Sequence, residues 1–347
     1  MKKVIFGKTG LLVSRIAFGG IPIMRISTSL AVEVVKESLN LGINFIDTAT
    51  AYADSQEKIG LAIDGIPRHE LVLATKSTAS DKETILKHID NSLIKLKTDY
   101  IDIYQLHNVS TEEKFEAVMG KGGAYEGLMQ AVMEGKVRYP GFSSHTMSIA
   151  KKVMLTGNFY SVQVPYNFID RQAEEEIIPL AKKMDMGFIA MKPLGGGLLN
   201  NAELCFKYLF QFEDIVPDPG IEKLGEMKEI AEILERSAPL SESDKEAMEN
   251  IRKEVGGTWC HRCDYCQPCP ENIRISTVLV VSSFIKRMPL ERAFSMVNKD
   301  MLQSENCTEC RTCVGRCPYN LDIPELLKQN RLLWNEYVEK HGGLHGS

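Results

Sequence analysis

The 347-residue sequence lacks several features that would assign it to particular classes of protein. No stretch approaches the roughly eighteen apolar residues that a transmembrane helix requires, so no membrane span or membrane partner is predicted. Neither sign of charge dominates, with 41 Lys and Arg against 46 Asp and Glu, which argues against nucleic acid as a partner. The stretch MKKVIFGKTG carries charges and glycines where a signal peptide would be apolar. We therefore expect a cytoplasmic protein.

Cysteine is nearly absent outside two short runs, CHRCDYCQPCP and CTECRTCVGRCP. The first run holds Cys260, Cys263, Cys266 and Cys269, and the second holds Cys307, Cys310, Cys313 and Cys317. The second run has the spacing C-x2-C-x2-C-x3-C-P of bacterial ferredoxins, in which three cysteines hold one cubane and the fourth reaches another. The remaining cysteine, Cys205, lies in the apolar helical stretch AELCFKYLF and is predicted to be part of the core.

The two runs are related to each other as an internal duplication. Cys307 lies 47 residues after Cys260, and Cys317 lies 48 residues after Cys269. The tails CPENIRIS and CPYNLDIP also match. Such approximate two-fold symmetry predicts two [4Fe–4S] clusters with crossed ligation. Each of the two predicted sets takes three cysteines from one run and the last cysteine of the other: Cys260, Cys263, Cys266 and Cys317 in one, Cys307, Cys310, Cys313 and Cys269 in the other.

Disulfides and zinc are the alternatives for these runs. Disulfides do not fit a chain that is not secreted. Zinc sites usually come as two separated CxxC pairs rather than as runs of four. Because the first run is one residue shorter than the second, a single cluster with an altered ligand set stays open as well.

The rest of the sequence alternates β-like runs with helical patterns. The expected strands are RIAFGG, INFIDTA, ELVLATK, YIDIYQLH, VRYPGFSSH, FYSVQVPYN, GFIAMKPLGGG and DIVPDPG. Eight strand–helix units in a row, with strands rich in Ile, Val and Phe, favour a (β/α)8 barrel. A doubly wound sheet is the second choice, but no GxGxxG follows the first strand.

The predicted domains are a barrel over residues 1–240, a linker helix over 241–258 and a mainly helical, ferredoxin-like iron–sulfur domain over 259–347. KVIFGKTGLLVS, before the first unit, is predicted to be a hairpin that covers one end of the barrel. DIPELLKQNRLLWNEYVEKH, after the second cysteine run, is predicted to be a final packed helix.

Catalytic side chains of such barrels lie at the C-terminal ends of the strands. Asp47 ends the second expected strand, and Tyr52 follows it in the loop. Lys76 ends the third strand and His107 the fourth. A tyrosine is a weak acid near neutral pH, and a lysine beside it stabilises the tyrosinate. These residues therefore predict Tyr52 as a general acid, tuned by Lys76, with Asp47 holding Lys76 and His107 orienting a carbonyl.

Several segments, in order, resemble motifs of the aldo-keto reductase superfamily. They are GKTGLLVSRIAFGG, INFIDTATAY, LVLATK, DIYQLH, GFSSH, VQVPYN and PLGGGLL. The cysteine-rich tail resembles that of a subgroup with a ferredoxin-like domain. The resemblance implies a (β/α)8 barrel, a small carbonyl substrate, and reversible hydride transfer between NADP(H) or NAD(H) and an aldehyde or ketone.

The resemblance also implies positions that bind the cofactor. Ser143, Ser144 and Gln163 would hold the nicotinamide carboxamide. Gly195, Gly196 and Gly197 would let a loop approach the pyrophosphate, and Lys192 is either a phosphate contact or an exposed lysine. Met191 stands where many relatives have an aromatic residue on which the nicotinamide stacks. The stretch GIEKLGEMKEI carries Glu222 and Glu226 where relatives often have basic residues, which favours NAD(H) over NADP(H) or a weak nucleotide site.

Two functions of different classes follow from these features. In the first, the barrel is a nicotinamide-dependent carbonyl reductase coupled to the clusters. In the second, the protein is an electron-transfer module that docks on a ferredoxin or another redox partner, with the barrel as a binding scaffold. Clusters that only hold the tail together are a third interpretation. Electron counting is the difficulty for the first function. Hydride transfer moves two electrons, whereas a cubane passes one at a time, and the sequence shows no flavin motif that could connect the two.

Overall fold

The computed structural model describes residues 1–236 and 238–341. Ser237, at the end of an expected helix, and residues 342–347, at the end of the predicted iron–sulfur domain, lie outside the described residues. The chain forms two compact units, one of residues 1–195 and 199–240 and one of residues 196–198 and 241–347. No helix in the described ranges has the length and apolarity that crossing a bilayer requires.

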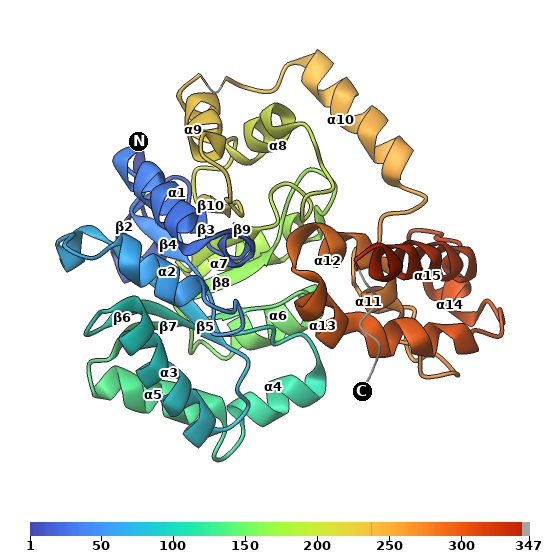
Figure 1. Cartoon of the computed structure of the whole chain (residues 1–347), viewed down its shortest axis with the longest axis horizontal. Helices are drawn as coiled ribbons and strands as arrows, with labels where there is room; N and C mark the ends of the chain where they lie inside the picture. The colour runs from blue at the N-terminus through green and yellow to red at the C-terminus, as the bar shows by residue number, and fades with distance from the viewer. Residues whose placement is uncertain (237, 342–347) are drawn as a thin grey trace. The chain divides into compact units, whose positions relative to one another are not determined.

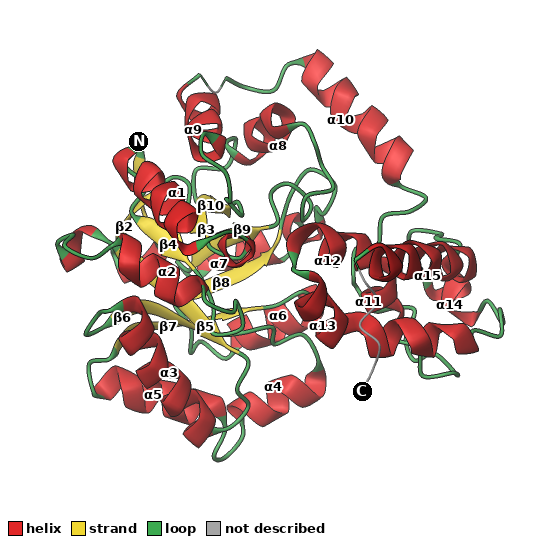
Figure 2. Ribbon diagram, in the orientation of Figure 1, coloured by secondary structure: helices red, strands yellow, loops and turns green. Residues whose placement is uncertain are grey.

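The first unit is a barrel of eight parallel strands with helices around it (Figures 1 and 2). Its strands are β3 (Phe18–Gly19), β4 (Phe45–Asp47), β5 (Val72–Ser77), β6 (Ile101–Leu106), β7 (Val137–Ser143), β8 (Ser161–Pro165), β9 (Gly187–Met191) and β10 (Ile215–Asp218). They pair in sequence order, and a parallel bridge between Gly19 and Gly220 joins the first strand to the last. The predicted (β/α)8 barrel is confirmed.

The helices that accompany the strands begin and end where local chemistry favours it. They are α1 (Thr28–Asn40), α2 (Ser55–Ala62), α3 (Lys82–Leu96), α4 (Glu112–Met119), α5 (Ala124–Met133), α6 (Met147–Leu155), α7 (Ile177–Lys183), α8 (Ala202–Leu209) and α9 (Glu226–Glu235). The Asp81 side chain accepts a hydrogen bond from the Thr84 amide and caps α3. Thr111 caps α4 in the same way through the Lys114 amide. Helix α4 is an additional helix that the sequence reading did not anticipate.

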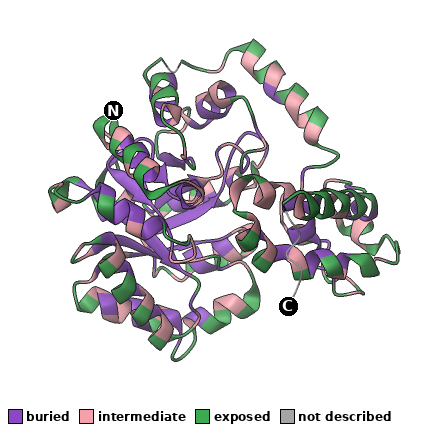
Figure 3. Cartoon of the chain, viewed as in Figure 1, coloured by how far each residue is buried: buried purple, intermediate pink, exposed green. Residues whose placement is uncertain are grey.

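A hairpin and a buried aromatic ring cover the N-terminal ends of the strands. Strands β1 (Lys3–Ile5) and β2 (Leu12–Ser14) pair antiparallel, as predicted. Phe6 follows β1, and its ring packs with Phe45, Val72 and Val216 in one buried cluster. Figure 3 shows the barrel strands as the most continuously buried part of this unit. Water is excluded there, so the polar side chains at the opposite strand ends are set on a rigid base.

The second unit is mainly helical, as predicted. Its helices are α10 (Glu242–Val255), α11 (Ile275–Leu279), α12 (Val281–Arg287), α13 (Leu290–Gln303), α14 (Thr312–Arg316) and α15 (Ile323–Lys340). Trp334 of α15 is buried, and its indole N–H donates to Asn298 Oδ1 at 3.1 Å. The predicted final helix is therefore packed against its neighbours.

The backbone repeats itself around the two cysteine runs. Three residues with left-handed φ in or just after the first run each have a counterpart 47 or 48 positions later. The pairs are Arg262 and Glu309, Asp264 and Arg311, and Asn272 and Asn320, with φ of 57° and 55°, 60° and 57°, and 55° and 53°. Non-glycine residues adopt this conformation rarely, so chance does not explain the match. The internal duplication inferred from sequence spacing extends to the backbone fold.

Candidate active site and cysteine centre

A buried ion pair joins the ends of two neighbouring barrel strands. Lys76 on β5 donates through Nζ to Asp47 Oδ2 at the end of β4 and to the Thr48 carbonyl at 2.9 Å. Both side chains are only 2% exposed. Burial alone would lower the pKa of Lys76, but the attraction of Asp47, followed by Tyr52 and Asp218, raises it above its ordinary value. Lys76 therefore carries a fixed positive charge at the rim of the barrel.

Tyr52 lies close to both this charge and His107. Lys76 Nζ is 5.4 Å from the centroid of the Tyr52 ring. The ring of His107 meets that of Tyr52 edge-on, with centroids 5.9 Å apart and an interplanar angle of 84°. The His107 amide donates to the Ser77 carbonyl at 2.8 Å, which holds His107 directly after β6. The structure thus brings together the four side chains that the sequence singled out.

His107 is neutral at physiological pH. Its surroundings exclude water, and the positive charges of Lys76 and Lys114 add to that effect, so the pKa of His107 falls to about 3. Its Nδ1 is buried and has no hydrogen-bond partner among residues 1–236 and 238–341. A neutral imidazole donates from one nitrogen and accepts at the other, so it can hydrogen-bond a carbonyl without adding charge.

The three predicted carboxamide residues lie on adjacent strands, but their side chains are engaged to different degrees. Ser143 ends β7 and accepts from the Asn108 amide at 2.9 Å. The Ser144 hydroxyl accepts from the Thr146 amide at 3.1 Å and so stabilises its own turn. Gln163 on β8 donates through Nε2 to Asp218 Oδ2 at 3.0 Å and, more weakly, to Asp47 Oδ2 at 3.4 Å. Gln163 therefore belongs to the same polar network as Lys76.

Asp218 is the site residue that the sequence reasoning missed. It ends β10 and is 9% exposed. The rule that polar residues at strand ends mark the site applies to it as well, because DIVPDPG was recognised as the eighth strand. A glycine leaves room for it, since a Cβ at Gly19 would stand 2.9 Å from Asp218 Oδ1. The rim thus contains two carboxylates, those of Asp47 and Asp218, and one lysine, Lys76.

The glycine-rich segment after β9 needs its glycines. Gly195, Gly196 and Gly197 have φ of 58°, 71° and 88°, all in the left-handed region that favours glycine. Lys192 also has positive φ, at 58°, and its carbonyl accepts from Asn167 Nδ2 at 3.0 Å. Met191 ends β9, at the position where the sequence comparison expected an aromatic residue.

Two carboxylates of the acidic stretch around the start of α9, those of Glu222 and Glu226, have protein partners. Glu222 forms an ion pair with Arg25. Glu226 Oε2 accepts from the Glu222 amide at 2.9 Å and from the Lys223 amide at 3.0 Å, which fixes the turn into α9. These contacts give both acidic residues a local structural role, so they no longer argue for a particular nucleotide.

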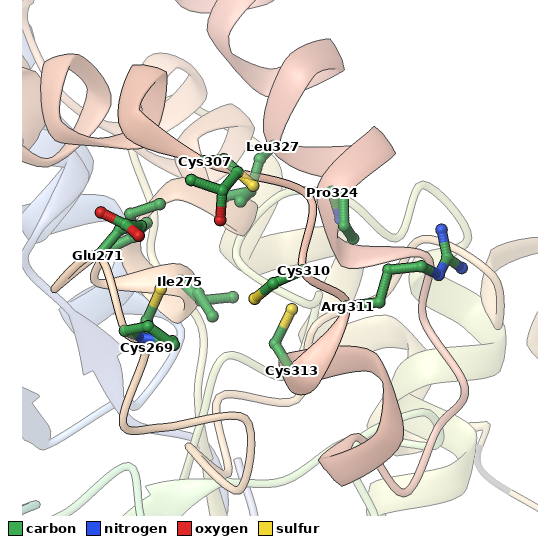
Figure 4. Close-up of a pocket in the computed structure, with 12 residues that line it drawn as sticks. Cys269, Glu271, Ile275, Cys307, Cys310, Arg311, Cys313, Pro324 and Leu327 are labelled. Carbon is green, nitrogen blue, oxygen red and sulfur yellow. The ribbon is translucent and has the colours of Figure 1, made fainter.

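In the second unit, one pocket gathers four of the cysteines. Cys269 of the first run and Cys307, Cys310 and Cys313 of the second line it together. Figure 4 shows the sulfurs of Cys269, Cys310 and Cys313 turned toward the space between them. No three His, Cys, Asp or Glu side chains in the described part of the chain are arranged around a single metal ion. The four cysteines instead line the wall of a pocket.

The other four cysteines form a second group. Burial is the main cause that raises the pKa of Cys263 and that of Cys266. Repulsion from a neighbouring thiolate adds to it, from Cys317 in the case of Cys263 and from Cys260 in the case of Cys266. Burial raises the pKa of both Cys260 and Cys266 to about 12. Cysteines of the two runs therefore lie near each other in both groups. All nine cysteines are free of disulfides.

Comparison with protein families identifies both parts of the chain. Residues 15–215, more than half of the chain, match the model described as "Aldo/keto reductase family". The chain belongs to the aldo/keto reductase family. Residues 259–322 match the model described as "4Fe-4S dicluster domain". The protein is therefore an oxidoreductase of the aldo-keto reductase type that carries a 4Fe–4S domain.

Individual aldo-keto reductases align with the barrel. The oxidoreductase YqkF of Bacillus subtilis is 32% identical over 220 residues, which cover 59% of this chain and 68% of that protein. The aldo-keto reductase YhdN of the same organism is 29% identical over 246 residues, covering 64% and 71%. A Klebsiella pneumoniae aldo/keto reductase solved with NADP and acetate superposes with a TM-score of 0.61 at 23% identity, covering 72% of this chain and 95% of that one. That last likeness concerns the fold.

Proposed function

We propose that the barrel is a nicotinamide-dependent carbonyl reductase in which Tyr52 is the general acid. The observation that carries the proposal is the buried Lys76–Asp47 pair, with Lys76 Nζ 5.4 Å from the centroid of the Tyr52 ring and the ring of His107 edge-on to it. An ammonium held beside a phenol stabilises the tyrosinate that remains after proton donation. Asp47 keeps that ammonium charged and in place.

The residues at the rim suit a bound nicotinamide. Gln163 Oε1 is buried and accepts no hydrogen bond from the described residues, which leaves an acceptor for a carboxamide N–H. The positive φ values of Gly195, Gly196 and Gly197 suit a loop that approaches a pyrophosphate. When bound, NADPH or NADH supplies the hydride. Ser143, Ser144, Lys192 and these glycines are the further proposed contacts.

The chain's own side chains then handle the carbonyl oxygen. Tyr52 and His107 both donate hydrogen bonds to it, which stabilises the negative charge that develops there. His107 is neutral, so it orients the oxygen without competing for the proton. Tyr52 gives its proton to the forming alkoxide, and Lys76 stabilises the resulting tyrosinate. In the reverse direction the same tyrosinate removes the proton of an alcohol.

We also propose two [4Fe–4S] clusters with crossed ligation. One is held by Cys260, Cys263, Cys266 and Cys317, and the other by Cys307, Cys310, Cys313 and Cys269. The pocket shared by Cys269 and the second run supports the second set. The proximity of Cys317 to Cys263 supports the first. When bound, the clusters accept and release single electrons.

The decisive test is anaerobic. The purified chain is assayed for iron, for EPR signals after dithionite, and for reduction of a panel of aldehydes and ketones with NADH and NADPH. We expect Tyr52→Phe to lower kcat by about 10²–10⁴-fold with nucleotide binding retained. Tyr125→Phe, which alters a half-buried tyrosine on α5, is the matched control and is expected to leave kcat unchanged.

A second candidate function is an electron carrier whose barrel is a binding scaffold. The exposure of Cys310 favours it, because a cluster held there would be accessible to a redox partner such as a ferredoxin. Binding of iron without binding of either nucleotide would support the electron carrier and reject the reductase. Nucleotide binding with Tyr52-dependent turnover would support the reductase.

A further inference from the structure

The amide of Gln163 is held in one orientation by carboxylates. Its Nε2 lies 3.0 Å from Asp218 Oδ2 and 3.4 Å from Asp47 Oδ2. An ionised carboxylate accepts hydrogen bonds and donates none, so only the N–H side of the amide can face it. Gln163 is 2% exposed, so bulk water does not compete with the carboxylates for its amide.

The other end of the same amide is the informative one. Gln163 Oε1 is buried and has no hydrogen-bond partner among the described residues. An unpartnered buried acceptor is unfavourable, and folded proteins rarely leave one without a reason. Turning the amide over would satisfy neither carboxylate. The site therefore presents an acceptor that requires a donor from a ligand.

We propose that Asp218 is a positioning residue that makes the nicotinamide site selective for a primary amide. It holds Gln163 so that Oε1, an acceptor, faces the ligand. The carboxamide N–H of a nicotinamide donates to Oε1. A ligand with an acetyl group in place of the carboxamide has no such donor and leaves Oε1 unpartnered. This inference rests on the proposed nicotinamide function of the barrel.

Asp47 alone does not perform this task. Its Oδ2 already accepts from Lys76 and is farther from Gln163 Nε2 than Asp218 Oδ2 is. Asp218 comes from β10, and the barrel places β10 beside β9 and next to the closing Gly19. The two carboxylates therefore divide the work, with Asp47 holding Lys76 and Asp218 holding Gln163.

The test compares two probes on the full-length, iron-loaded protein. Dissociation constants for NAD(P)⁺ and for its 3-acetylpyridine analogue are measured by calorimetry. We expect the wild type to prefer the carboxamide by about 10–100-fold, the effect of one hydrogen bond to a buried acceptor. In Asp218→Asn, whose amide can donate as well as accept, Gln163 can turn over, and the preference should fall to about threefold or less.

Two further variants separate positioning from damage to the fold. Adding Gln163→Glu to Asp218→Asn restores a group that only accepts, so the preference for the carboxamide should return. Asp185→Asn removes an exposed carboxylate before β9 at a residue whose φ of 49° asparagine tolerates, and it should leave the preference unchanged.

The outcomes are distinct. An unchanged preference in Asp218→Asn, with nucleotide still bound, would overturn the role of Asp218 and leave the reductase proposal intact. Equal binding of both probes by the wild type would overturn it as well. Failure of the wild type to bind any nicotinamide nucleotide would overturn both proposals.

Discussion

The barrel rim and the cysteine unit both bury groups that water would otherwise solvate, but they compensate the cost differently. At the rim, Lys76 and Asp47 neutralise each other, and Gln163 and Asp218 complete the network. Among the cysteines, burial raises the pKa of Cys260 to about 12. The positive charge of Arg262 opposes this effect but does not outweigh it. The ion pair at the rim is therefore compensated within the protein, whereas we expect the thiolates of the cysteine unit to depend on iron for their stability.

The largest predicted effect is that of removing iron. The core of the cysteine unit is small, so cluster ligation should provide much of its folding free energy, on the order of 10 kcal/mol for structural metal sites. Treatment with an iron chelator should expose the segment after residue 241 to protease and abolish its transition in calorimetry. The barrel should retain its own transition and its nucleotide binding. Equal resistance of the two units with and without iron would erase the contrast between them.

The second largest effect concerns the stability of the barrel, where the protein itself compensates the buried charge. Lys76→Met leaves Asp47 buried without its partner, which should destabilise the barrel by about 3–5 kcal/mol. Lys58→Met is the matched control. Lys58 is also buried, but it donates to the Ile23 and Ile26 carbonyls and pairs with the half-exposed Asp54. Its removal therefore leaves no buried charge without a partner. We expect a smaller loss in urea denaturation, about 1–2 kcal/mol. Similar losses in the two variants would contradict a special role for the ion pair.

The pH dependence of stability should also report on the rim. The pKa of His107 is about 3 in the folded barrel and about 6.5 when unfolded, so between these values only the unfolded chain binds the proton. Stability should therefore be full above pH 6.5 and fall as the pH decreases toward 3, by at most about 1.4 kcal/mol per pH unit. His107→Gln should flatten the slope, whereas the exposed His69→Gln should not. Parallel slopes for wild type and His107→Gln would refute this.

The smallest effect compares the two cysteine groups. Cys260→Ser and Cys310→Ser each remove one proposed ligand, and each should lower the iron content by up to about half. Cys260 is partly buried and Cys310 is exposed, so Cys260→Ser should lower the midpoint of thermal unfolding more. Cys205→Ser, in the barrel, is the control and should keep all of the iron. A larger shift for Cys310→Ser would reverse the expected order.

The sequence predicted the fold well because the pattern is repetitive. Strand-like and helical runs alternate eight times, and each expected strand is present. Lys76 and His107 were placed at the rim correctly, because each lies at the C-terminal end of its strand and in a parallel barrel all such ends meet at one rim. Helix α4 was missed because EEKFEAVM lies within the fourth expected unit, between its strand and its helix, where a loop was expected.

The details of the site were less predictable from the sequence. Asp218 satisfies the same rule as Lys76, but its importance comes from its distance to Gln163, two strands away in the sheet. A sequence gives the position of a side chain along a strand, not the direction in which an amide is held. The roles of Glu222 and Glu226 were obscured for the same reason, because their partners come from Arg25 and from local backbone amides.

The duplicated backbone has a consequence for biosynthesis. If each cluster takes three cysteines from one run and one from the other, the first run cannot complete its cluster when it leaves the ribosome. It must wait for Cys317, which is translated after all the other cysteines of the two runs. The set that includes Cys269 is completed earlier, by Cys313. On that ligation, neither cluster could be completed before the barrel has been synthesised, and a chain truncated before Cys317 would lack the last ligand of one of them.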